Sequence, residues 1–156
     1  WSSRDWIEDL FNDFSDGAFI DTEASTLGDG DGAVVLKKIN PTSTIYMASG
    51  AYMSSAFNMN GQKPVQILVW QRSFSNSNCG TTCQLKLQLR VAPDNNGQPG
   101  AWTEWYGVSG ASTYFTSSSS TLVSTNLNGQ QWVQYQALFS GDGSGTPVLE
   151  EVKVNL

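Results

Sequence analysis

Most of the chain alternates apolar and polar residues with a period of two. The clearest stretch is 84–91, where leucines and a valine at odd positions alternate with Gln, Lys and Arg at even ones. This period is typical of a half-buried antiparallel strand. The same pattern predicts further strands at 65–70, 132–139 and 152–156, and weaker ones at 18–24, 33–39, 44–57, 101–107 and 112–125.

Clusters of Gly, Asp and Asn separate these stretches, at 28–32, 58–61, 93–97 and 141–145. Such residues favour the backbone conformations of tight turns. Many short strands with regular turns between them are typical of sandwiches, jelly rolls and barrels. We therefore predict an all-β fold, an antiparallel two-sheet β-sandwich of jelly-roll-like form, over residues 17–156.

The N-terminal residues 1–16 have a different period. Five apolar side chains recur at spacings of three and four and predict a helix over 3–14. They are Trp6, Ile7, Leu10, Phe11 and Phe14. The acidic Glu8 near the start suits the helix dipole. We expect one short N-terminal helix whose apolar stripe either makes an assembly contact with a neighbouring chain or covers an open end of the sandwich.

Charge and composition limit the kinds of partner that we expect for this protein. The 156 residues carry a formal net charge of −6, and only 14% are charged. Nucleic acid is not an expected partner, because its phosphates require a cationic surface. No apolar run approaches the roughly 20 residues that a membrane span needs. The chain shows no signal peptide, so it is either cytoplasmic or already processed.

The two cysteines favour the processed alternative. Cys79 and Cys83 are separated by three residues, and the chain has no histidine and no other cysteine. A zinc site would need two further ligands of this kind. A disulfide that closes a small turn is the simplest interpretation, and it indicates an oxidising compartment. We expect a secreted or cell-surface protein, the periplasm included.

The second half also carries a recognisable pattern, in residues 49–57, 102–107, 127–135 and 141–152. It resembles a β-sandwich module of bacterial surface and secreted proteins, which occurs in adhesin-like and pilin-like chains. The resemblance implies a structural or adhesive module with protein partners, as part of a pilus-like filament or a large cell-surface protein.

Aromatic residues suggest an alternative function. Trp102, Tyr106 and Tyr114 are close in sequence, and Trp70 ends a predicted strand. Exposed rings of this kind stack on the flat faces of sugars at little entropic cost. These residues are candidates for ligand binding, and the chain would then be a carbohydrate-binding module of a secreted polysaccharide-degrading enzyme. Trp105, Trp132 and Tyr135 are expected in the core instead.

Acidic residues offer a candidate metal site. Asp29 and Asp31 alternate with glycines, and Asp21 lies upstream. Carboxylates on a flexible loop suit Ca²⁺, although Asp-Gly pairs are equally ordinary in turns. A structural calcium ion is thus an option, but no cofactor is required.

Catalytic chemistry has little support in the sequence. Without histidine the chain cannot build a Ser-His-Asp triad. A glycosidase needs two facing carboxylates, and the acids within predicted strands of the second half are Glu104, Glu150 and Glu151. Glu150 is in phase with the apolar residues of its strand, and we expect it to accept hydrogen bonds or to pair with Arg72 or Arg90 rather than to catalyse a reaction. We expect the protein not to be an enzyme.

Overall fold

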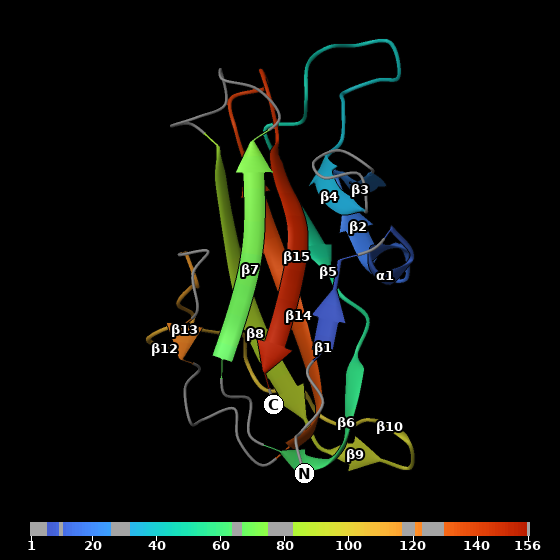
Figure 1. Ribbon diagram of the computed structural model, residues 1–156, viewed down its shortest axis with the longest axis vertical. Helices are drawn as coiled ribbons and strands as arrows, with labels where there is room; N and C mark the ends of the chain where they lie inside the picture. Colours follow the sequence, from blue (N-terminus) through green and yellow to red (C-terminus); the bar gives the residue numbers. More distant parts are fainter. Residues whose placement is uncertain are drawn as a thin grey trace.

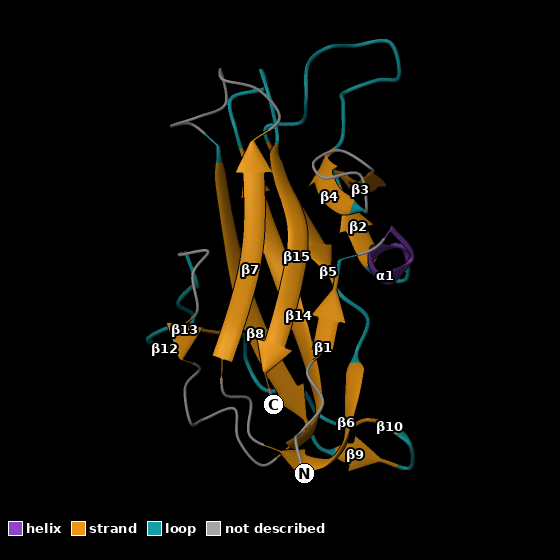
Figure 2. Cartoon of the chain, viewed as in Figure 1, coloured by secondary structure: helices purple, strands orange, loops and turns teal. Residues whose placement is uncertain are grey.

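The chain folds into two packed antiparallel sheets, as the periodicity predicts. The computed structural model describes residues 6–9, 11–25, 32–63, 67–74, 83–116, 121–122 and 130–155. Figure 1 shows the first sheet in front of the second, and Figure 2 shows that strands dominate both layers. The predicted fold class, an all-β sandwich with one short N-terminal helix, is confirmed for the described residues.

The described strands form two large sheets and one hairpin. In spatial order the first sheet contains β13 (Thr121–Leu122), β7 (Ile67–Phe74), β15 (Pro147–Asn155), β4 (Ala33–Leu36) and β3 (Thr22–Ser25), with β1 (Trp6–Glu8) also paired with β15. The second contains β12 (Gly110–Ala111), β11 (Tyr106–Gly107), β8 (Gln84–Ala92), β14 (Gln130–Ser140), β5 (Ser49–Met53) and β2 (Ala18–Ile20), with β6 (Phe57–Lys63) also paired with β14. The hairpin joins β9 (Asp94–Asn95) to β10 (Gln98–Pro99).

The core lies between the sheets and is rich in aromatic rings. The alternate leucines and valine of β8 are buried, and so are the alternate residues 133, 135, 137 and 139 of β14. Tyr135 lies at the centre, with its ring 5.5 Å from that of Trp6 and 6.0 Å from that of Tyr52. Trp6 also stacks on Phe57 at 5.1 Å. Such aromatic pairs stabilise a core beyond the area that they bury.

The predicted helix over 3–14 is wrong in its extent. Trp6–Glu8 form strand β1, which pairs with Val152–Val154 of β15, and the helix α1 spans only Phe11–Ser15. Pairing as a strand buries both Trp6 and Glu8, whose side chains lie on the same side of β1. Glu8 therefore has no part in a helix N-terminus. The division of the chain at residue 16 stays a prediction, although β1 is hydrogen-bonded into the first sheet.

Turn chemistry fits the predicted connections where the structure describes them. Asn96 and Gly97 both have positive φ, at 55° and 86°, and they close the hairpin between β9 and β10. This is the combination that a two-residue hairpin turn favours. Asp21, with φ of 53°, separates β2 from β3, so that the chain leaves one sheet and enters the other at this residue.

Two further expectations concern the cysteines and the membrane. Cys83 is buried and has no free thiol, whereas Cys79 lies outside the described residues. Their pairing with each other stays a prediction. Within the described ranges, no helix has the length and apolar character needed to cross a membrane.

Candidate functional site

The second sheet has a polar surface directed away from the core. Because alternate residues of β8 face the core, Lys86, Gln88 and Arg90 lie on the opposite side. The strand register sets Arg90 beside Gln134, and Gln88 beside Gln136. We call this side of the sheet the outer face. Figure 1 views the molecule from the side of the first sheet, so the outer face points away from the reader.

The segment 102–116 runs along the edge of β8 and adds aromatic rings to the outer face. Backbone hydrogen bonds join Thr103 to Val91 at 2.9 Å and Phe115 to Leu87 at 2.8 Å, with β11 paired to β8 between them. The segment turns back tightly, since a Cβ at Gly107 would collide with the backbone of Thr113. Only glycine leaves room for this close approach.

Two tryptophans of this segment contact one arginine. The guanidinium carbon of Arg90 lies 4.6 Å from the ring centroid of Trp102 and 4.3 Å from that of Trp105. Its Nε donates a hydrogen bond to Oε1 of Gln134 at 2.8 Å. Burial lowers the pKa of Arg90. Ring contacts and the hydrogen bond together orient the guanidinium group on the outer face.

The glutamines beside Arg90 are also oriented. Gln134 donates to the carbonyl of Ser54 at 2.6 Å, so its Oε1 faces Arg90. Gln136 donates to Oε1 of Gln88 at 2.6 Å. Gln88 in turn donates to the carbonyl of Thr113 at 2.8 Å, which ties the sheet to the edge segment. These fixed amides give the outer face preformed donors and acceptors.

A hollow of about 380 Å³ opens on the outer face, and it is lined by Gln88, Glu104, Trp105, Ser112 and Tyr114. Cations flank its two rings, because Arg90 lies against Trp105 and Nζ of Lys86 lies 4.5 Å from the ring centroid of Tyr114. Apolar ring surfaces with a few placed polar groups are the usual composition of a small-molecule site.

The structure does not bring all four predicted ligand-binding residues to one site. Trp102 and Tyr114 both contact side chains of the outer face. Tyr106 packs against the hydrophobic core instead. Trp70 belongs to β7 in the other sheet, and its side chain is not among those that the structure describes. Trp105, expected in the core, is half-buried on the outer face, while Tyr135 is fully buried as expected.

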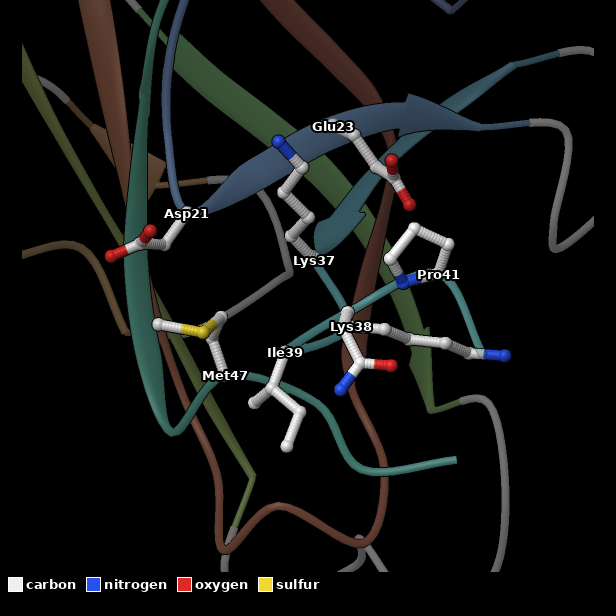
Figure 3. Close-up of a pocket in the computed structure, with 8 residues that line it drawn as sticks. Asp21, Glu23, Lys37, Lys38, Ile39, Pro41 and Met47 are labelled. Atoms are coloured by element: carbon white, nitrogen blue, oxygen red, sulfur yellow. The ribbon is translucent and has the colours of Figure 1, made fainter. Parts of the chain in front are cut away.

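A second hollow, of about 760 Å³, lies beside the strands β3 and β4 (Figure 3). Asp21 and Glu23 line it together with Lys37 and Lys38. In the view of Figure 3, the side chain of Lys37 lies between those of Asp21 and Glu23. A lysine in this position disfavours a divalent cation through charge repulsion.

This hollow bears on the predicted calcium site. Of its three expected ligands, Asp29 and Asp31 lie outside the described residues and Asp21 has the lysine-rich surroundings above. Across the described ranges, no group of three or more Asp, Glu, Cys or His side chains could hold a metal ion. The calcium ion stays a prediction.

A buried carboxyl group lies on the opposite side of the second sheet, in the core. Glu8 is only 4% exposed, and the hydroxyl of Tyr135 donates to its Oε1 at 2.5 Å. Burial raises the pKa of Glu8 to about 8, the bond from Tyr135 lowers it, and the nearby Asp16 and Asp13 raise it further. The hydroxyl of Tyr52 donates to the carbonyl of Phe14.

The residues predicted to make an assembly contact divide into two groups. Trp6 and Phe14 are buried in the core cluster of this chain. Ile7 is 47% exposed and Phe11 is 43% exposed, and Leu10 lies outside the described residues. Among the described residues of this segment, Ile7 and Phe11 are thus the apolar side chains exposed for a contact with another chain.

Sequence reasoning did not place Arg90 beside the aromatic residues, and it gave no site role to Gln134 or Glu8. The alternation in 84–91 places Arg90 on a polar strand face, but it carries no information about which aromatic residues lie beside it. For Glu8, the signal was the alternation of Trp6, Ile7 and Glu8, which the helical spacing of the neighbouring apolar residues obscured.

Comparison with known proteins gives similarity to solved structures alone. No protein-family model and no curated protein matches the chain. The K2 cleaved adhesin domain of Lys-gingipain is 10% identical, with a TM-score of 0.46, and covers 98% of this chain and 100% of that one. The CBM22-1–GH10 modules of Clostridium thermocellum xylanase 10B, complexed with xylohexaose, are 14% identical with a TM-score of 0.45, over 100% of this chain and 28% of that one.

A third structure is CBM27-1 of Caldicellulosiruptor saccharolyticus in complex with mannohexaose. It is 10% identical with a TM-score of 0.43, over 97% of both chains. The first of these structures is an adhesin domain, the second contains a carbohydrate-binding module beside a GH10 module, and the third is a carbohydrate-binding module. At such low identities and TM-scores they identify neither a family nor a function for this chain.

Proposed function

We propose that this chain is a non-catalytic adhesive module of a secreted or cell-surface protein, and that it binds a carbohydrate chain on the outer face. The observation that carries the proposal is the arrangement of Trp102, Trp105 and Tyr114 around oriented polar groups. Rings of this kind present an apolar surface to the C–H faces of sugars and lose little entropy on binding.

The polar groups of the outer face supply the second requirement, which is hydrogen bonding to hydroxyls. Gln88 is buried, and its oxygen accepts a hydrogen bond from Gln136. Gln136 is half-buried and uses one N–H in this bond, so its second N–H and its carbonyl oxygen are left for a ligand. Because these side chains are already fixed, binding costs little further ordering.

Retention on insoluble polysaccharides tests the proposal. The purified protein is incubated with cellulose, xylan, mannan and a polygalacturonate gel, and the bound fraction is measured. We expect retention on at least one of them and its loss in Trp105→Ala. Phe11→Ala is the matched control, because Phe11 is an exposed aromatic residue on α1, which contacts the first sheet.

The outcome distinguishes specific binding at the outer face from nonspecific adsorption to the polysaccharide. Equal loss in Trp105→Ala and Phe11→Ala, or retention that survives Trp105→Ala together with Trp102→Ala, would contradict a site on the outer face. Thermal melting of each variant shows whether it is folded. Membership of a pilus-like filament stays a prediction, which electron microscopy of native material would test.

A further inference from the structure

Arg90 is held on the outer face by several contacts. Two indole rings lie against its guanidinium group, and Gln134 accepts the hydrogen bond from its Nε. Gln134 is itself fixed by the carbonyl of Ser54. A surface arginine normally samples many rotamers, and this one is held in place before any ligand arrives.

The guanidinium group keeps unused donors. Arginine has five N–H groups. One donates to Gln134 and another points to Sδ of Met53 at 3.7 Å. The other three have no partner in the described part of the chain, and no carboxylate there pairs with Arg90. The charge is therefore oriented and partly desolvated, and no carboxylate of the described residues neutralises it.

We infer that Arg90 binds the carboxylate of an acidic sugar, so that the ligand of the outer face is a polysaccharide containing uronic acid residues. The inference rests on the proposed carbohydrate-binding function. The planar guanidinium group matches a carboxylate through two parallel hydrogen bonds, and such charge-assisted bonds are stronger than neutral ones.

The neighbouring charges fit a repeating anionic polymer. Lys86 lies four positions from Arg90 on β8, which is about 13 Å along a strand. Glu104 lines the hollow together with Trp105 and Tyr114, so it repels a ligand carboxylate there, whereas Arg90 attracts one. At physiological ionic strength, salt screens electrostatic interactions beyond about 8 Å. A ligand on the outer face is therefore affected more by the nearby charges of Lys86 and Arg90 than by the net charge of −6 of the whole chain.

Polymers that differ only in the carboxyl group test the inference. Binding of polygalacturonate and alginate is measured by affinity electrophoresis and calorimetry, beside carboxyl-reduced forms of the same polymers. We expect at least one acidic polymer to bind, with about tenfold or greater weakening on carboxyl reduction. Affinity for the acidic polymer should also fall as salt rises.

Variants of the protein give the second arm. Arg90→Lys keeps the charge but loses the planar fork, and should weaken binding of the acidic polymer about tenfold or more. Arg90→Gln should weaken it further. Lys37→Gln is the charge-matched control, because Lys37 lines the other hollow. Thermal melting confirms that each variant is folded.

The results separate this inference from the proposed function. If the reduced polymers bind as tightly as the acidic ones and Arg90→Lys has no effect, the inference is overturned, while loss of binding in Trp105→Ala would still support a carbohydrate site. If neither acidic polymer binds, the inference is likewise overturned, and the retention assay on cellulose, xylan and mannan decides the proposed function on its own.

Discussion

Replacing the buried Glu8 by glutamine should change how the stability of this protein depends on pH. The carboxyl of Glu8 has a pKa of about 8 in the folded protein, against 4.5 for an unperturbed glutamate. Between these values the folded state holds one more proton than the unfolded state. The free energy of unfolding therefore falls as pH rises, by about 1.4 kcal/mol per pH unit.

Over the whole interval between these two pKa values, the free energy of unfolding falls by at most about 5 kcal/mol. Burial is the main cause, and Asp16 and Asp13 add to it by charge repulsion. In Glu8→Gln the side chain cannot ionise, and its Oε1 still accepts the hydrogen bond from Tyr135. We expect stability near that of the wild type at pH 5, and higher stability than the wild type at pH 8.

Urea unfolding, followed by tryptophan fluorescence from pH 5 to pH 8, measures this difference. The chain has no histidine, so few other side chains titrate in this range. Glu23→Gln is the control, because it makes the same substitution at an exposed side chain on β3. If Glu8→Gln and the wild type show the same pH slope, the assigned protonation of Glu8 is refuted.

Three further predictions concern stability. Tyr135→Phe removes the donor to Glu8, and should cost about 1–3 kcal/mol in urea unfolding and raise the pKa of Glu8 further. Gly107→Ala places a Cβ against the backbone of Thr113, and should cost roughly 1–3 kcal/mol and weaken carbohydrate retention, as thermal melting and the polysaccharide assay would show. Cys83→Ser should cost about 2 kcal/mol, provided that thiol titration of the wild type finds no free thiol.

The sheets could be predicted from sequence because their signal is local. In β8 and β14 every second residue is buried, so the period of two alone identifies a strand and its core side. The N-terminal segment could not be read in this way. Trp6 satisfies a helical spacing and a strand alternation equally well, and the pairing of β1 with β15 selects the strand.

The candidate site could likewise be predicted from the sequence only in part. The cluster of aromatic residues around Trp102 and Tyr114 was visible in the sequence, and these two residues lie on the outer face, whereas Tyr106 packs against the core. Their contacts with Arg90 and Lys86 depend on the register between the segment 102–116 and β8, which is set by hydrogen bonds between residues far apart along the chain. The same holds for Glu8 and Tyr135, which are 127 positions apart.

The signals of the tryptophan indole N–H groups would test the outer face most directly. Oligogalacturonate, xylohexaose and mannohexaose are each titrated into ¹⁵N-labelled protein, and the indole signals are assigned with single Trp→Phe variants. We predict that at least one oligosaccharide shifts the signals of Trp102 and Trp105 and leaves that of the buried Trp6 unchanged. No shift with any of the three, or shifts confined to other tryptophans, would contradict a carbohydrate site on the outer face.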